Sequence, residues 1–115
     1  MFQCLRTVVY SAQHLSKARE FYRQLLGQEP YFDEPFYVGF DVNGYELSLD
    51  PNAPATGQAG PITYWRVADV GAAYARLLAC GAAPHEAVHD VGGGVRLGSV
   101  VDPGTNVVGV ITELP

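Results

Sequence analysis

The 115-residue sequence contains one lysine, Lys17, against six arginines and twelve acidic residues, which leaves a net charge of −5 at neutral pH. It has no basic stripe that could follow a phosphate backbone, so nucleic acid is not expected as a partner. No apolar run approaches membrane-spanning length, and the first residues lack the apolar stretch of a signal peptide. The two cysteines, Cys4 and Cys80, lie far apart without CxxC spacing. We therefore expect buried thiols in a cytoplasmic protein that has no contact with a membrane.

The two halves of the chain follow the same plan. Each begins with a β-rich run and continues into an amphipathic helical stretch that Gly27 or Gly81 closes, and Asp69 is a predicted N-cap for the second helix. Short strand-like runs follow each helix, and Asn43-Gly44 predicts a tight hairpin. The expected strands are residues 7–11, 31–33, 36–42 and 45–50, then 62–67, 85–90, 95–102 and 106–112. The sequence thus predicts one domain, 1–115, made of two βαβββ modules: about 1–52 and about 61–115, joined by a Pro/Ala/Gly-rich linker at about 51–60.

The stretch HEAVH at residues 85–89 matches the HExxH signature of zinc proteases, in which two histidines on one helical face hold the metal. Pro84 precedes it and a glycine-rich turn follows it, which leaves no helix to carry the pair. On an extended strand His85 and His89 would be ~13 Å apart, too far for one zinc ion. The segment is therefore predicted to be a hairpin strand without zinc. GGGVRLG has the glycines of a dinucleotide-binding loop, but it leads into a strand rather than a helix, so it is only a weak signal of a nucleotide site.

Three stretches of the chain, HLSKAREFYRQLLGQEP, ADVGAAYARLLACGA and VVDPGTNVVGVI, keep the order and spacing of two modules. The first two resemble the module helices, and the third the closing turn and strand, of the vicinal oxygen chelate superfamily. Members of that family include glyoxalase I, extradiol dioxygenases, fosfomycin-resistance enzymes and bleomycin-resistance proteins. The resemblance covers essentially the entire chain and implies an α+β fold in which two curled mixed sheets enclose a central cup, with the helices outside. It also implies a homodimer, whose cup is built within one chain or across two.

The family's enzymes hold a divalent metal in the cup through side chains from the first and last strands of each module. The resemblance places those positions at Thr7, Glu46, Ile62 and Gly109, and only Glu46 carries a usual metal ligand. A carboxylate and a hydroxyl cannot strip a divalent ion of most of its water. We therefore expect no metal and no cofactor, and family catalysis does not follow from the fold.

Strand alternation predicts what the cup contains. In YELSLD, Tyr45, Leu47 and Leu49 form the apolar face under the helix, so Glu46 faces the cup. The same alternation predicts a mixed apolar and polar ligand-binding surface made of Thr7, Val9, Glu46, Ser48, Ile62, Tyr64, Arg66, Gly109 and Ile111. Such a surface is typical of a small-molecule pocket, although the same side chains could fill the cup or form a dimer seam. Trp65, Phe21 and Tyr22 are predicted to be core residues, whereas Phe36, Tyr37 and Phe40 suit either the cup or the core.

Two functional classes remain open. The first is a metal-free protein that binds a small molecule, partly aromatic or cationic, in the cup. The second is an enzyme, either metal-free with Glu46 as the catalytic base or dependent on metal ligands that the pattern does not reveal. Glu46 needs a hydrogen-bond donor when buried, and Tyr64 or Arg66 are the expected donors. If only hydroxyls reach Glu46, burial is expected to raise its pKa.

Overall fold

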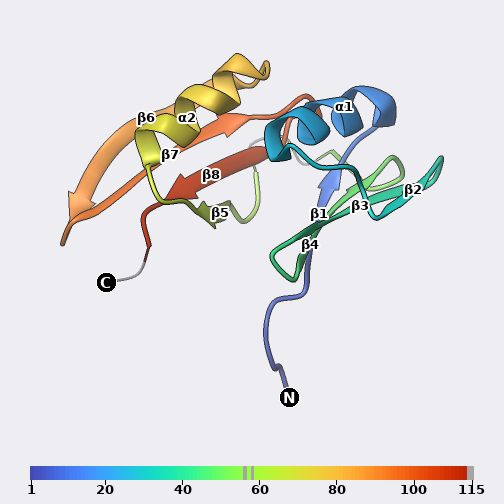
Figure 1. Ribbon diagram of the computed structural model, residues 1–115, viewed down its shortest axis with the longest axis horizontal. Coiled ribbons are helices and arrows are strands. Elements are labelled where there is room, and N and C mark those ends of the chain that lie inside the picture. Colours follow the sequence, from blue (N-terminus) through green and yellow to red (C-terminus); the bar gives the residue numbers. More distant parts are fainter. Residues whose placement is uncertain (56, 58, 114–115) are drawn as a thin grey trace.

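The computed structural model describes residues 1–55, 57 and 59–113, which contain two helices and eight strands (Figure 1). Each half contributes one strand, one helix and three further strands, so the predicted α+β fold of two βαβββ modules is confirmed. The elements are β1 (Thr7–Ser11), α1 (Leu15–Leu26), β2 (Phe32–Glu34), β3 (Tyr37–Val42), β4 (Tyr45–Asp50), β5 (Thr63–Arg66), α2 (Val70–Ala79), β6 (Ala83–Gly92), β7 (Val95–Val101) and β8 (Val107–Ile111).

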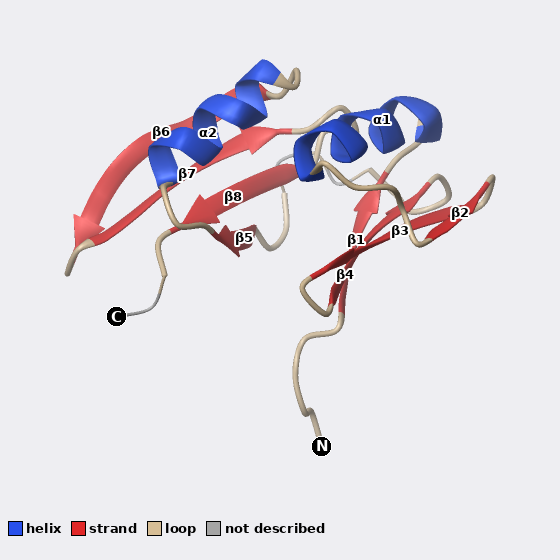
Figure 2. Cartoon of the chain, viewed as in Figure 1, coloured by secondary structure: helices blue, strands red, loops and turns tan. Residues whose placement is uncertain are grey.

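Each module forms its own four-stranded mixed sheet, in the orders β1-β4-β3-β2 and β5-β8-β7-β6. The first strand of each module pairs in parallel with the last, and the other pairs are antiparallel. Both helices lie on the same side of the molecule, outside the sheets (Figure 2). The sheet faces that the helices leave uncovered are the two halves of the expected cup.

Local sequence signals explain where α1 ends, where α2 begins and where the chain turns between β3 and β4. Gly27 closes α1 in the left-handed conformation with φ 66°, and the Asp69 side chain caps α2 by accepting from the Ala72 backbone N–H at 3.0 Å. Asn43 and Gly44 have φ values of 53° and 90°, as expected for a tight hairpin between β3 and β4. No helix among the described residues is long and apolar enough to cross a membrane.

The core lies between the helices and the sheets and follows the alternation read from the sequence. Leu47 and Leu49 of β4 are buried in the core, as are Phe21 and Tyr22 of α1. Trp65 packs against the same cluster. Two expectations are wrong. Tyr45 is exposed rather than packed under the helix, because it is the first residue of β4 and directly follows the hairpin turn. Cys4 is an exposed thiol of the irregular segment before β1, whereas Cys80 is half-buried.

The HEAVH stretch lies on β6, so the prediction that it is not helical is confirmed. The two imidazoles have separate partners: His85 Nδ1 lies 2.7 Å from Ser99 Oγ, and His89 Nε2 lies 3.2 Å from Glu86 Oε1. Irregular register on both sides of Glu86 interrupts the simple alternation of the strand. That this segment binds no zinc stays a prediction.

A buried polar network joins the two modules where α1 meets the turn between β7 and β8. The Tyr22 hydroxyl donates to Asp102 Oδ2 at 2.6 Å, and Asn106 donates to the other oxygen of that carboxylate from its backbone N–H at 2.8 Å. The Asn106 side chain also donates to the Ser11 carbonyl oxygen at 2.9 Å, and its own oxygen accepts from the Ser11 N–H at 3.2 Å. This network ties β1 and α1 of module one to the closing turn of module two.

Candidate functional site

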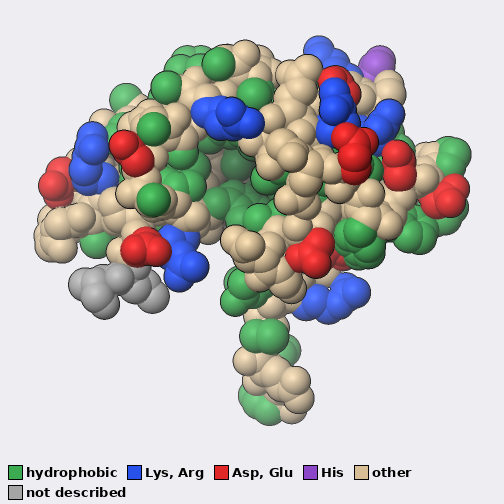
Figure 3. Space-filling view, in the orientation of Figure 1, with side chains coloured by type: hydrophobic (Ala, Val, Ile, Leu, Met, Phe, Trp, Pro, Cys, Tyr) green, Lys and Arg blue, Asp and Glu red, His purple; other side chains and the backbone are tan. Residues whose placement is uncertain are grey.

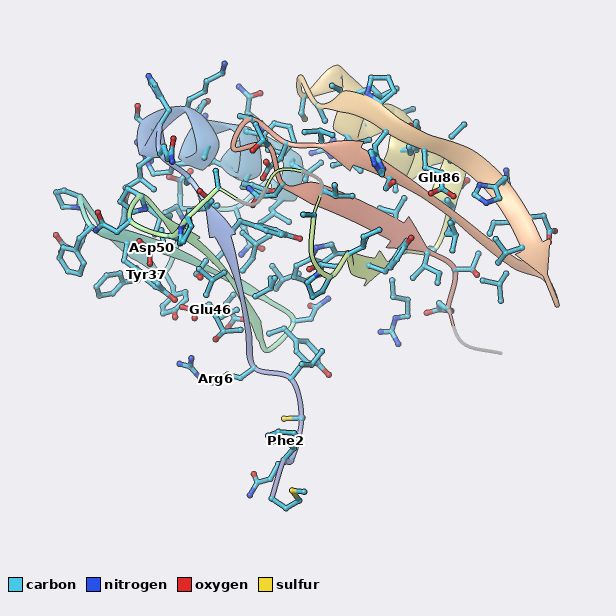
Figure 4. The ribbon with its side chains drawn as sticks, turned by 180° about the vertical axis from the view of Figure 1, so that it is seen from behind. Phe2, Arg6, Tyr37, Glu46, Asp50 and Glu86 are labelled. Carbon is cyan, nitrogen blue, oxygen red and sulfur yellow. The ribbon has the colours of Figure 1, made fainter. Side chains whose placement is uncertain are left out.

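Glu46 is the centre of a hydrogen-bonded cluster on the cup face of module one. Only 8 % of this residue is exposed to solvent. Its Oε1 accepts from the Thr7 hydroxyl at 2.9 Å and from the Tyr37 hydroxyl at 2.8 Å, and its Oε2 accepts from the Tyr31 hydroxyl. The Arg6 guanidinium adds a weaker contact, with Nη1 3.6 Å from Oε1. Figure 4 shows Arg6, Glu46 and Tyr37 on the same side of the molecule.

Strand register brings these groups together. Thr7 pairs with Glu46 across the parallel β1–β4 ladder, so their side chains share one face. On β3, Gly39 leaves the space that the cluster occupies: a β-carbon there would lie 2.7 Å from Glu46 Oε2 and 3.0 Å from Cε1 of Tyr31. The absence of a side chain at Gly39 therefore lets the Tyr31 hydroxyl reach the carboxylate.

The donors lower the pKa of Glu46, whereas a raised pKa was expected for the case in which only hydroxyls reach it. Burial on its own raises that pKa, but the hydroxyls of Tyr31, Tyr37 and Thr7, together with the Arg6 charge, favour the ionised form and outweigh it. The same contact with Glu46 raises the pKa of the Tyr31 phenol. The cluster therefore holds an ionised carboxylate and protonated phenols at neutral pH.

The expected donors to Glu46, Tyr64 and Arg66, do not reach it. Arg66 is exposed, and its Nε lies 3.8 Å from Glu113 Oε1. Tyr64 lies against its ladder partner Gly109, where a β-carbon would be 2.4 Å from Cδ1 of the Tyr64 ring. The prediction was wrong because both carboxylate oxygens of Glu46 already accept hydrogen bonds from residues of module one. Tyr31, Tyr37 and Arg6 were missed, although alternation along β3 would have placed Tyr37 on the Glu46 face.

The remaining predicted residues divide between the cup floor and a cavity at the module junction. Ser48 is fully buried, and its hydroxyl donates to the Val8 carbonyl oxygen at 3.2 Å. Val9 and Ile62 are exposed to the hollow, and both line a cavity of about 260 Å³ between β1 and β5, whereas Ile111 is half-buried. Figure 3 shows hydrophobic side chains in the hollow between the modules. Of the aromatic residues left undecided, Phe40 is in the core, Tyr37 is at the cup, and Phe36 is exposed.

The residues at the family's metal positions do not fit a divalent ion. The Ala12 N–H donates to the Asp50 carbonyl oxygen in module one, and the Val67 N–H donates to the Ile111 carbonyl oxygen in module two, so Asp50 and Ile111 are equivalent positions. Glu46 lies four residues before Asp50, and the residue four before Ile111 is Val107 rather than Gly109. Neither Val107 nor Gly109 has a side chain that can bind a metal, and Ile62, the counterpart of Thr7, has none either. The described part of the chain holds no cluster of three or more His, Cys, Asp or Glu side chains suited to a metal.

A model of the Glyoxalase/Bleomycin resistance protein/Dioxygenase superfamily matches residues 5–110. The chain belongs to this superfamily. No curated protein sequence matches the chain significantly. A glyoxalase-related enzyme from Fulvimarina pelagi has a similar structure, with a TM-score of 0.82, 19 % identity, and coverage of 97 % of this chain and 89 % of that one.

Two further solved structures of the same superfamily fold are similar. A lactoylglutathione lyase from Agrobacterium tumefaciens has a TM-score of 0.77 at 23 % identity, with 97 % of this chain and 95 % of that chain covered. A glyoxalase/bleomycin resistance protein/dioxygenase family enzyme from Burkholderia phytofirmans PsJN has a TM-score of 0.80 at 16 % identity, with coverage of 97 % and 100 %. At these identities the likeness establishes the fold alone.

Proposed function

We propose that this superfamily member binds a small molecule in its cup without a divalent metal. The observation that carries the proposal is the environment of Glu46, the one usual ligand left at the family's metal positions. Its carboxylate oxygens accept from three hydroxyl groups of its own module. Those donors satisfy the buried charge as a metal would, which leaves the ionised carboxylate as a fixed polar anchor beside an apolar surface.

Catalysis with Glu46 as a general base is the alternative function. A useful base at neutral pH has a pKa near the working pH, and enzymes reach that value by burying the carboxyl in apolar surroundings. At Glu46 the hydroxyl donors act in the other direction and lower the pKa. Binding is therefore the better supported of the two functions.

The first experiment is metal analysis of protein expressed with nickel, zinc, iron and manganese supplied. We expect far less than one equivalent of each per chain and no isomerisation of hemithioacetals, because isoleucine and valine at the module-two positions offer no donor. Small molecules released on denaturation are then compared by mass spectrometry between wild type and Glu46→Gln. Glu34→Gln, an exposed carboxylate of β2, serves as the control. One equivalent of metal, lost on Glu46→Ala, would refute the proposal.

The protein is also proposed to be a homodimer. Each sheet ends in an edge strand, and β6 is exposed along most of its length. The cup face exposes Val9, Ile62 and Tyr64, an apolar surface that a second copy could cover. Multi-angle light scattering at micromolar concentration should give twice the chain mass of 12.4 kDa. A stable monomer over the whole concentration range would contradict the dimer.

A further inference from the structure

A second, smaller cavity of about 150 Å³ lies beside Glu46, at the end of module one where the N-terminal segment leaves β1. It is separate from the cavity at the module junction. It is lined by Arg6, Tyr31, Asp41, Gly44, Tyr45 and Glu46. Figure 4 shows Arg6 next to Glu46 at the base of β1, with Phe2 further out along the segment.

The charges that line this cavity do not balance. Asp41 is the direct cross-strand partner of Glu46 on the β3–β4 ladder, so two carboxylates lie opposite each other on one face. Like charges in that position repel each other and destabilise the sheet unless a cation lies between or beside them. Among the six lining residues Arg6 is the one cation, and its guanidinium lies beside Glu46, so the lining has a net charge of −1.

Arg6 is held through its backbone much more firmly than through its side chain. Its carbonyl oxygen accepts from the Glu46 N–H at 2.7 Å, which fixes the backbone against β4. Its side chain is 80 % exposed, donates to Thr7 Oγ1 at 2.8 Å, and lies 3.6 Å from the Glu46 carboxylate. Exposed ion pairs of this kind contribute little free energy, so the guanidinium can leave without moving the strand.

An aromatic residue at the cavity adds a second feature that suits a cation. Tyr31 is largely exposed and lines the cavity with the two carboxylates, whereas strand alternation places the Tyr45 side chain on the face of β4 opposite Glu46. Aromatic faces attract ammonium and guanidinium groups through the ring quadrupole, and carboxylates attract them through charge. The Tyr31 hydroxyl is already committed to Glu46, so its ring stays in place at the cavity wall.

We propose that this cavity binds the ammonium or guanidinium group of a small organic cation, and that the Arg6 side chain gives up its place when the ligand binds. The inference rests on the proposed function and adds the ligand's chemical class: one positive charge on an apolar body. Arg6 acts as an internal competitor whose guanidinium stands where the ligand's cation would lie.

The test uses three probes with the same apolar body: 2-phenylethylamine as the cation, 2-phenylethanol as the neutral control and phenylacetate as the anion. Binding to the full chain is followed by two-dimensional NMR of backbone amides at millimolar probe concentration. We expect saturable shifts of the Thr7, Asp41 and Glu46 amides with the amine and none with the other two probes. Equal binding of the alcohol, binding of phenylacetate in its place, or no shift with the amine would overturn the inference.

Two variants separate the roles of the lining residues. Arg6→Gln removes the competitor and is expected to tighten amine binding about three- to tenfold. Asp41→Asn is expected to weaken binding by a similar factor, and its side-chain oxygen can still accept from the Gly44 N–H, as Asp41 does at 2.8 Å. Glu34→Gln, which removes an exposed charge of the same module outside the cavity, should leave the affinity unchanged.

The outcomes distinguish this inference from the proposed function. Weaker amine binding by Arg6→Gln, or an equal loss in Glu34→Gln and Asp41→Asn, would overturn the cation site. In either case a metal-free chain that binds the alcohol would still agree with the proposed function. Stoichiometric metal that depends on Glu46 would refute the proposed function whatever the probes show.

Discussion

Gly104→Ala is expected to lower the free energy of unfolding by about 3 kcal/mol, because a β-carbon there has no space. It would lie 2.1 Å from the Ser11 carbonyl oxygen and 2.8 Å from Nδ2 of Asn106. The first contact is with backbone of β1, which is fixed in its ladder with β4. The turn between β7 and β8 would have to move away from β1, and the Asn106–Ser11 hydrogen bonds would stretch or break.

The matched control for Gly104→Ala is Gly109→Ala. A β-carbon at Gly109 would also be too close to a neighbour, 2.4 Å from Cδ1 of Tyr64, but that neighbour is a side-chain ring. Tyr64 is 37 % exposed and can rotate toward the hollow, so the loss should be clearly smaller. Equilibrium unfolding in urea with unchanged m-values measures both. Equal losses for the two variants would show that the close approach of backbone to backbone is not the cause.

The repeated pattern of the sequence predicted the modules because strand alternation, glycine stops and caps act over only a few residues. Asn43-Gly44, Gly27 and Asp69 each determine a turn or a helix end through their own backbone or side chain. The same short range explains why Leu47 and Glu46 were correctly assigned to opposite faces of β4. The family resemblance then indicated how the modules are arranged, which local patterns do not contain.

The site was predicted less well because its contacts join residues distant in sequence. Alternation predicts that Glu46 faces the cup, but it does not predict which donor on a neighbouring strand reaches the carboxylate. Tyr31 was predicted to begin a strand at residues 31–33 but precedes β2, and it reaches Glu46 only because Gly39 leaves the space between them. The predicted counterpart of Glu46 in module two, Gly109, was wrong by two residues for a similar reason. The backbone hydrogen bonds between strands identify Val107, and the sequence does not show them.

The polar network at the module junction connects the fold to the cup, since it holds the two halves of the cup together. Asp102 is 5 % exposed, and its burial raises its pKa although Tyr22 and Asn106 donate to it. A carboxylate that is buried in this way is stable only while its donors remain in place. Within the described part of the chain, the Tyr22 hydroxyl, from a side chain with no exposed surface, is the one donor to Asp102 that comes from module one.

Tyr22→Phe is therefore expected to lower the free energy of unfolding at neutral pH by about 2 kcal/mol, with little change in packed volume. The loss should depend on pH. Removing a donor to the charged form raises the pKa of Asp102 further, so the variant takes up a proton at a higher pH than the wild type. A raised pKa makes folding less favourable above it, and this cost disappears as the carboxyl is protonated. The difference between wild type and variant should thus shrink as the pH falls from neutrality toward about 4.

Tyr10→Phe is the control for that pH dependence. The Tyr10 hydroxyl accepts from the Trp65 Nε1–H at 3.1 Å, so its removal leaves a neutral donor without this partner. A loss of about 1 kcal/mol is expected there, with no comparable change over the same pH range. Urea unfolding of the three proteins at a series of pH values gives both comparisons. A constant difference for Tyr22→Phe at every pH would contradict the role of the Tyr22 hydroxyl as a donor that favours the ionised form of Asp102.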